Sequence, residues 1–389
     1  MNPVFVGCFL TLLFAACRDI QPLPQPPTEP DTKNAVWVAA PQHNNLMHHP
    51  DTLTRQLDKL KTLGINTLFV CAWADNLTAW KSRVLLQNSN YPSLEATWMY
   101  RQHASGDYDP LADLIEKAHA RQMKVILWFE YGLMAAWGKE PNADNHPVLA
   151  AHPDWKGIGN DGKGSNYNNT DFYYNSYHPE VQQFILDLIQ EALDLYPDID
   201  GIQGDDRLPA SPANSGYDET TRKLFREAHM GQEPPADFRD SSWVQWRLGI
   251  LNQLAGRMHQ LVKSQNPNLV MAFSPNPYPW CLENLMQDWP SWIQSGHVDQ
   301  LNVQVYRTSF TAYRNTADAS WDWAAKSGLK KEQFVPGIIL GLSSKKMMNP
   351  SLLDSILHFN REQQYGGESY FYVKWLTEDS SFDDLIKGN

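Results

Sequence analysis

The sequence predicts an α/β protein in the form of a single (β/α)₈ barrel, the TIM barrel, with loop insertions. Three observations lead to this prediction. Eight short apolar runs occur in about 350 residues, helix-like segments lie between them, and no Gly-x-Gly-x-x-Gly follows the first run. The alternative is a doubly wound open sheet, but its nucleotide-binding form has no support because that glycine pattern is missing from the sequence.

The predicted barrel strands are apolar runs of similar length. In chain order they are Ala35–Ala40, Asn66–Trp73, Lys124–Tyr131, Gly201–Asp206, Val270–Pro275, Gln300–Tyr306, Val335–Leu342 and Ser369–Trp375. The predicted helices have apolar residues at helical spacing and are Thr52–Leu63, Pro110–Arg121, Pro179–Leu195, Trp243–Gln265, Trp321–Ser327 and Pro350–Gln364. Active sites of such barrels lie at the carboxyl ends of the strands, so polar residues there are the candidates.

The N-terminal residues resemble an export signal. Val4–Ala16 is an apolar run that is too short to span a bilayer and has the length of a signal-peptide core. The small residues before Cys17 resemble a bacterial lipobox. We therefore expect a signal peptide over residues 1–16 and lipidation of Cys17. Ordinary secretion and an uncleaved anchor stay open, because Phe14 stands where Leu is usual and no Lys or Arg precedes the run.

A Pro-rich stretch follows this signal. Residues 17–34 are predicted to be an extended tether, and residues 35–389 the catalytic barrel domain. A lipid on Cys17 would place the protein in the bacterial cell envelope, on the periplasmic or cell-surface side. The protein would then contact the membrane through that anchor only.

Composition excludes several classes of partner. The net charge is −12 and no stretch is basic enough to follow phosphates, so nucleic acid is not an expected partner. The chain contains fifteen Trp, whose wide faces suit the C–H faces of sugar rings, although large α/β cores also use Trp. Only Cys71 and Cys281 lie in the folded part, and their spacing matches neither a disulfide scaffold nor a zinc site. We expect a monomer.

A carboxylate ends the fourth predicted strand. Side chains alternate along a strand, so Gln203 and Asp205 share one face and the apolar Ile202 takes the other. Since Ile202 should face the helices, Asp205 should point toward the barrel axis at the mouth. Asp206 faces the other way; capping of the next helix fits it better, and substrate binding is its alternative role. Asp200 precedes the strand and is expected to be structural.

A second carboxylate ends the third predicted strand. Glu130 follows Trp128 and Phe129, and burial beside them would raise its pKa, as a general acid requires. A structural ion pair with an Arg is the alternative for Glu130. Asp75, after the second strand, is a weaker candidate. Two carboxylates in an aromatic mouth predict glycoside hydrolysis, in which one protonates the leaving oxygen and the other attacks or activates water.

Other strand ends offer substrate-binding candidates. Gln304 and Tyr306 share one face of the sixth strand, and Asn276 follows the fifth. Possible sugar platforms at or after strand ends are Trp73, Trp98, Trp280 and Trp375.

Short motifs also occur in a fixed order along the chain. They are Asp109-Pro110-Leu111-Ala112 with Glu116-Lys117-Ala118-His119-Ala120-Arg121, His152-Pro153-Asp154-Trp155, Asn175 with His178-Pro179-Glu180-Val181, Asp200-Gly201-Ile202 with Asp205-Asp206, Trp246-Arg247, Ser274-Pro275 and Gln304-Val305-Tyr306. In this order they resemble the glycosyl hydrolase-like family 10 group, barrel proteins common among bacterial lipoproteins. The resemblance implies a barrel, glycosidase activity and an essential Asp205 or Asp206.

The chain departs from that family pattern at three places. Gln122 stands where Gly is usual, Gln203-Gly204 replaces His-Phe, and Glu130 stands where Asn is more common. These differences leave the substrate open. It is either the denuded peptidoglycan strand that some relatives cleave or another bacterial or environmental polysaccharide.

A chitinase-type mechanism is not expected. Chitinase-type barrels carry Asp-Gly-x-Asp-x-Asp-x-Glu on the fourth strand. Aligned from Asp200, this chain has Arg207 where the acidic Glu belongs. Asp205 therefore needs a partner from another strand, and Glu130 is the best candidate.

Two other classes of function remain as alternatives. The first is a non-catalytic glycan-binding lipoprotein on a barrel scaffold, in which Asp205→Asn would change nothing measurable. The second is a metal-dependent hydrolase such as a deacetylase, which needs His ligands at strand ends. His43 and His48-His49 lie in a loop instead, so we expect no metal and no cofactor.

Overall fold

The computed structural model describes residues 32–104, 106–342 and 345–387, and the chain from Thr32 onward forms one compact unit. The signal peptide expected over residues 1–16 and the lipidation expected at Cys17 lie outside the described residues. The first strand begins at Lys33, where the tether was predicted to continue to residue 34. The reason is pairing in the sheet, because Lys33 and Asn34 lie opposite Gly367 and Glu368 of the last strand.

Within the described residues, the central sheet has eight strands, and all neighbours in it run parallel. They are β1 (Lys33–Val38), β2 (Thr67–Cys71), β5 (Lys124–Phe129), β9 (Gly201–Gly204), β10 (Val270–Phe273), β11 (Gln300–Leu301), β12 (Gly337–Ile339) and β15 (Gly367–Phe371). The sheet order is β11-β10-β9-β5-β2-β1-β15-β12. Bridges from Leu301 to Phe334 and from Gln304 to Gly337 join its two ends, so the sheet closes into the predicted barrel.

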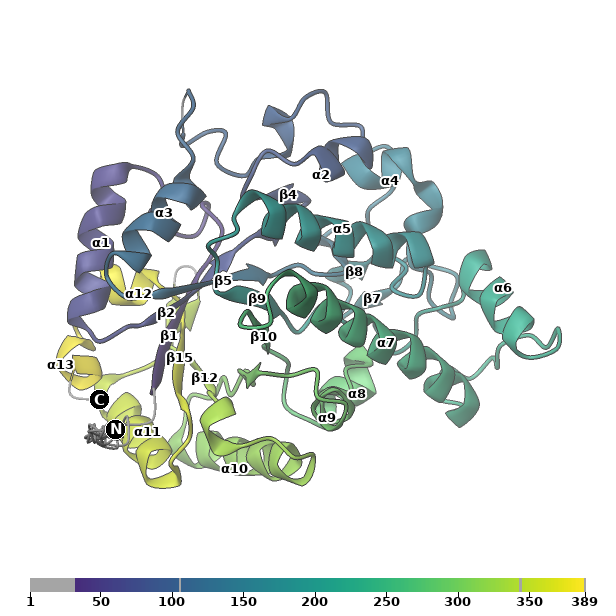
Figure 1. Cartoon of the computed structure of the whole chain (residues 1–389). Coiled ribbons are helices and arrows are strands. Elements are labelled where there is room, and N and C mark those ends of the chain that lie inside the picture. Colours follow the sequence, from purple (N-terminus) through teal and green to yellow (C-terminus); the bar gives the residue numbers. More distant parts are fainter. Residues whose placement is uncertain (1–31, 105, 343–344, 388–389) are drawn as a thin grey trace, which may run out of the picture. The chain divides into compact units, whose positions relative to one another are not determined.

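Helices of this unit surround the barrel (Figure 1). Those that follow barrel strands are α1 (Pro50–Thr62), α3 (Pro110–His119), α5 (Pro179–Leu195), α7 (Ser241–Gln265), α10 (Phe310–Lys326) and α11 (Pro350–Gln363). Several begin with Pro after a capping side chain. Asp109 accepts hydrogen bonds from the backbone N–H groups of Leu111 and Ala112, for example. The prediction for α10 began too late, at Trp321. Ser309 caps this helix by accepting from the N–H of Ala312.

The loops between the barrel strands and helices contain further short helices and strands. The short helices among them are α2 (Arg83–Gln87), α4 (Pro147–Ala151), α6 (Glu219–Ala228), α8 (Trp280–Leu285), α9 (Trp289–Gln294), α12 (Lys374–Thr377) and α13 (Asp383–Lys387). Two small hairpins are β3 (Trp73–Ala74) with β4 (Leu77–Thr78), and β13 (Gly341–Leu342) with β14 (Lys345–Lys346). A separate antiparallel sheet has the order β6-β8-β7, with β6 at Met134–Trp137, β8 at Asp171–Tyr173 and β7 at Asn166–Tyr167. In the view of Figure 1, β7 and β8 lie to the right of β5 and β9.

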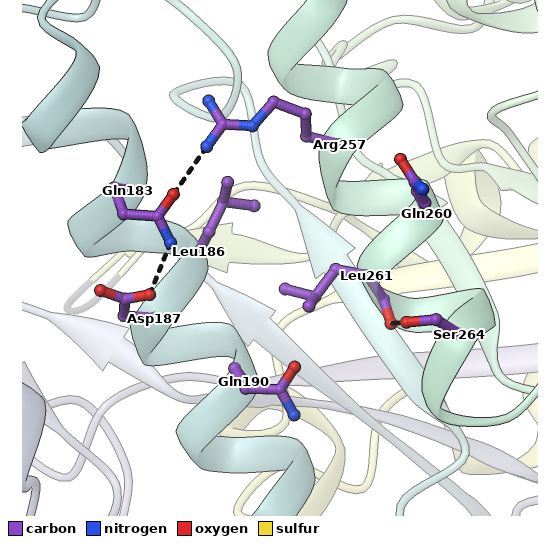
Figure 2. A pocket seen from close by; sticks show the side chains of 8 residues that line it. All are labelled: Gln183, Leu186, Asp187, Gln190, Arg257, Gln260, Leu261 and Ser264. Carbon is purple, nitrogen blue, oxygen red and sulfur yellow. Dashed lines mark hydrogen bonds between the residues drawn. The ribbon is translucent and has the colours of Figure 1, made fainter.

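A shallow pocket lies on the outer helix layer, between α5 and α7 (Figure 2). Its volume is about 400 Å³. Arg257 Nη2 donates a hydrogen bond to Gln183 Oε1 at 2.8 Å, and Gln183 Nε2 donates to Asp187 Oδ1 at 2.7 Å. The residues expected at the active site do not line this pocket, which is bounded by polar side chains and by Leu186 and Leu261 of the two helices. It is therefore not the candidate site.

In the part of the chain that the structure describes, no helix has the length and apolarity needed to cross a membrane.

Candidate active site

Asp205 lies at the barrel mouth and faces the interior. Two residues before it, Gln203 accepts a hydrogen bond on Oε1 from Trp37 Nε1 at 2.8 Å, across the barrel from β1. Alternation along the chain turns Asp205 the same way. Gln304, which follows β11, donates a hydrogen bond from Nε2 to Asp205 Oδ1 at 2.9 Å. Asp205 is only 2% exposed, so its carboxyl oxygens contact protein groups such as this amide and not bulk water.

Asp206 joins a polar cluster beside it. Arg207 Nη1 lies 2.9 Å from Asp206 Oδ1, and Asn276 Nδ2 donates to Asp206 Oδ2 at 3.0 Å. The capping role considered for Asp206 is thus replaced by side-chain contacts at the mouth. Arg207 Nη1 also lies 3.6 Å from Asp205 Oδ2, and its Nη2 lies 3.7 Å from Asp171 Oδ2. These carboxylates raise the pKa of Arg207, although burial opposes them.

Burial dominates the electrostatics of Asp205. Removal from water raises the pKa of Asp205 well above its ordinary value, and the neighbouring Asp206 and Glu130 raise it further. Arg207 acts in the opposite direction. Glu130 is thus one of the charged groups that act on Asp205, and Arg207 lowers the pKa of both carboxyl groups.

Glu130 follows β5, the strand that pairs with β9. Cys71, the last residue of β2, donates a hydrogen bond from Sγ to Glu130 Oε2 at 3.3 Å. Burial raises the pKa of Glu130 from its ordinary value of 4.5 to about 7. Arg207 and the Cys71 hydrogen bond lower it, whereas Asp75 and Asp206 raise it. A carboxylic acid with this pKa holds its proton over much of the neutral range.

Aromatic rings line the interior beside these carboxyl groups. The ring of Phe371, at the end of β15, lies 5.4 Å from that of Tyr306, 6.1 Å from Trp37 and 6.4 Å from Trp128. Burial, followed by Asp205, raises the pKa of Tyr306 well above its ordinary value. Tyr306 therefore contributes a neutral hydroxyl to the pocket. Trp37 and Phe371 were not among the residues predicted from the sequence. Each occupies a position of its strand whose side chain points into the barrel, as the contact between the two rings shows.

Arg207 and Cys71 were also missed as parts of the site. The sequence showed Arg207 only as the replacement for a chitinase Glu, and its position directly after Asp205 and Asp206 was the available signal. Cys71 carried no such signal because it reads as one more apolar residue of a buried strand.

Two predicted sugar platforms are wrong. Trp73 is 0% exposed, and its Nε1 donates to Gly132 O at 3.0 Å. Trp98 is 3% exposed, and its Nε1 donates to Ala79 O at 3.0 Å. Both belong to the hydrophobic core, where the ring of Trp73 lies 5.8 Å from that of Phe184 in α5. Trp375 is half-buried, and Trp280 is exposed.

The remaining candidates take peripheral or structural positions. Asp75 is exposed and accepts a hydrogen bond from Gln42 Nε2 at 3.1 Å. Asp200, expected to be structural, accepts from Val125 N at 2.7 Å and contacts His119 Nε2 at 2.9 Å.

The described residues were also searched for metal ligands. Among them, no group of three or more His, Cys, Asp or Glu side chains is arranged to hold a metal ion. Cys71 and Cys281 are both buried free thiols.

Comparison with known families gives one extended match. The model of the family described as "Glycosyl hydrolase-like 10" matches residues 33–357. Two curated relatives are the glycosyl hydrolase DigH of Escherichia coli strain K12, 25% identical over 296 residues, and the glycosyl hydrolase YngK of Bacillus subtilis, 27% identical over 320 residues. These alignments cover 69% and 74% of this chain, but only 61% and 56% of the relatives.

Solved structures show similarity of fold. The glycoside hydrolase domain of PgaB (BpsB) from Bordetella bronchiseptica has a TM-score of 0.61 and 12% identity, covering 91% of this chain and 98% of that domain. The catalytic domain of the β-amylase from Paenibacillus polymyxa has a TM-score of 0.61 and 13% identity, covering 92% and 98%. Both support the barrel architecture.

Proposed function

Because the chain belongs to the glycosyl hydrolase-like 10 family, we propose that it cleaves O-glycosidic bonds of a polysaccharide with Glu130 and Asp205 as its catalytic residues. The observation that carries the proposal is that two carboxyl groups follow neighbouring barrel strands, each held by a side chain from another strand or strand end: Asp205, beside Arg207, by Gln304, and Glu130 by Cys71. Paired carboxyl groups are the common machinery of glycoside hydrolysis.

The surroundings of the pair assign the roles. When two carboxyl groups are coupled and both pKa values are raised, one proton is shared between them near neutral pH. Asp205 accepts a hydrogen bond from Gln304 and lies near Arg207, and both favour a negative charge on it. Arg207 also lowers the pKa of Glu130, but the hydrogen-bond donor to Glu130 is the weaker Cys71 thiol. Because the amide of Gln304 is a stronger donor than the thiol, we assign the proton to Glu130 as the general acid and the role of nucleophile or water-activating base to Asp205.

We propose a glycan polymer as the substrate, either the peptidoglycan glycan strand or another bacterial or environmental glycan. The relatives named above are glycosyl hydrolases, and the chain spans about three fifths of their length. Lipidation of Cys17 would hold the barrel at the cell envelope, beside peptidoglycan, which favours that strand as the first polymer to test.

The test is a cleavage assay on a panel of purified polysaccharides and denuded peptidoglycan strands. Wild type, Asp205→Asn and Glu130→Gln are compared through the reducing ends that they release. Shortening of one polymer by wild type, with a loss of at least a hundredfold in both variants, supports the proposal. If wild type shortens no glycan but binds one, the alternative of a glycan-binding lipoprotein is correct. If Glu130→Gln keeps full activity, Glu130 is not the acid.

A further inference from the structure

We propose that the inserted sheet β6-β8-β7 carries a second glycan-binding site, an aromatic row made of Trp137, Tyr167 and Trp280, which holds the chain beyond the bond being cleaved. This inference rests on the proposed glycosidase function and extends it. It assigns the protein to polymer substrates that occupy the row and the catalytic pocket at once.

The register of the sheet places two of the rings on one face. Trp137 of β6 pairs directly with Asp171 of β8, and Tyr167 of β7 pairs with the same Asp171 from the other side. Directly paired residues of antiparallel strands have side chains on the same face. Neighbouring strands lie about 4.8 Å apart, so the backbones of Trp137 and Tyr167 are about 10 Å apart. That spacing suits rings that contact successive sugars of one chain.

That face of the sheet is turned toward the catalytic carboxyl groups. Asp171, which lies between the two aromatic residues, has Oδ2 3.7 Å from Arg207 Nη2. Tyr173, two residues later and therefore on the same face, interacts electrostatically with Arg207, Asp206 and Asp205. Asp171 therefore connects the aromatic row to the cluster of Arg207, Asp206 and Asp205.

Trp280 extends the row from the barrel itself. It begins α8, shortly after β10, and its ring lies 5.4 Å from that of Tyr167 at an interplanar angle of 89°. Trp280 is 38% exposed and Trp137 is 67% exposed. Large aromatic side chains left open to solvent, beside a polar site, mark a binding surface.

The chemistry of the row favours a glycan over a protein partner. A protein interface needs a contiguous apolar centre. Here Asp171, which lies 3.7 Å from Arg207, stands between Trp137 and Tyr167, so the two apolar rings are separated by a group that can hydrogen-bond hydroxyls. Sugar rings present this alternation, with C–H faces flanked by hydroxyl groups.

The experiment measures binding separately from cleavage. Trp137→Ala, Tyr167→Ala and Trp280→Ala are each made in wild type and in Asp205→Asn. The probes are disaccharide and octasaccharide fragments of the denuded peptidoglycan strand, titrated calorimetrically against the Asp205→Asn forms. Leu195→Ala is the control, because Leu195 is also exposed but ends α5, at the opposite end of the barrel. Circular dichroism checks that each variant is folded.

We expect the row variants to weaken octasaccharide binding at least tenfold and disaccharide binding less than twofold. Leu195→Ala should change neither. Octasaccharide binding equal to that of the parent in all three row variants overturns the inference, even if wild type cleaves the polymer. If Asp205→Asn binds the octasaccharide through the row but wild type cleaves nothing, the row is upheld and the proposed catalysis fails. Absence of all binding overturns the inference for this polymer class.

Discussion

The Sγ atom of Cys71 lies 3.3 Å from Oε2 of Glu130, so the thiol that ends β2 donates a hydrogen bond to the carboxyl group that follows β5. This bond lowers the pKa of Glu130 against the larger effect of burial, which raises it. It also occupies Oε2 as an acceptor, which leaves Oε1 to carry the proton of a general acid.

Cys71→Ala is expected to raise the pKa of Glu130, because the donor that favours its ionised form is lost. A hydrogen bond of about 0.5–1 kcal/mol corresponds to about half a pH unit in the alkaline limb of kcat/KM. Cys71→Ser, which keeps a donor, should leave the limb near its wild-type position or move it to lower pH. Cys281→Ala is the matched control, since Cys281 is another buried free thiol and hydrogen-bonds to Gln287 O. If the alkaline limb of kcat/KM in Cys71→Ala stays at the wild-type pH, the thiol does not act on Glu130.

The pH dependence of activity should show an alkaline limb centred near pH 7. Burial raises the pKa of Glu130 to about 7, and a general acid must be protonated, so activity falls as pH rises through that value. The measurement is kcat/KM against pH for the free enzyme. In Glu130→Gln, the residual activity toward a substrate with an activated leaving group, which needs no acid, should lack this limb. A wild-type limb that stays in Glu130→Gln would assign it to another group.

The stability of Glu130→Gln should exceed that of wild type at high pH. The pKa of Glu130 is raised in the folded protein, to about 7 from 4.5, so the folded state binds the proton more tightly than the unfolded state. The stabilisation from this proton is complete below about pH 4.5 and is lost as pH rises through about 7. The difference corresponds to at most about 3 kcal/mol.

Urea unfolding at about pH 4 and pH 8 checks this sign. Glu130→Gln should gain up to about 3 kcal/mol over wild type at the higher pH and little at the lower. A larger gain at pH 4 than at pH 8 would reverse the sign and show that the ionised form of Glu130 is the stabilised one.

Gln304→Ala should lower kcat with little effect on KM. Gln304 Nε2 donates to Asp205 Oδ1 at 2.9 Å, and this contact orients the carboxylate rather than the substrate. A hydrogen bond to a charged group contributes about 1.5–3 kcal/mol, which predicts a loss of about 10- to 100-fold. Gln190→Ala is a suitable control, because Gln190 lies on α5 and bonds Asp194. A rise in KM alone would instead place Gln304 in substrate binding.

Much of the barrel was predictable because strands and helices follow local patterns. Each predicted strand run contains or overlaps a strand of the barrel, and the inward direction of Gln203 and Asp205 follows from alternation and the apolar Ile202 between them. The boundaries were less accurate. β11 spans only Gln300–Leu301 of a longer predicted run, although the backbone N–H groups of Asn302 and Gln304 still donate to Phe273 O and Pro275 O.

The sequence by itself determined the architecture, the family resemblance and the two carboxyl groups at the ends of β5 and β9, because alternation and strand ends are properties of short segments. Only the tertiary structure decided what surrounds these groups. The hydrogen bond between Cys71 and Glu130 joins residues 59 positions apart in the sequence, and that between Gln304 and Asp205 joins residues 99 positions apart. No local sequence pattern specifies either bond. Burial of Trp73 and exposure of Trp137 were likewise decided by which loops pack over which rings, since burial depends on contacts between distant segments.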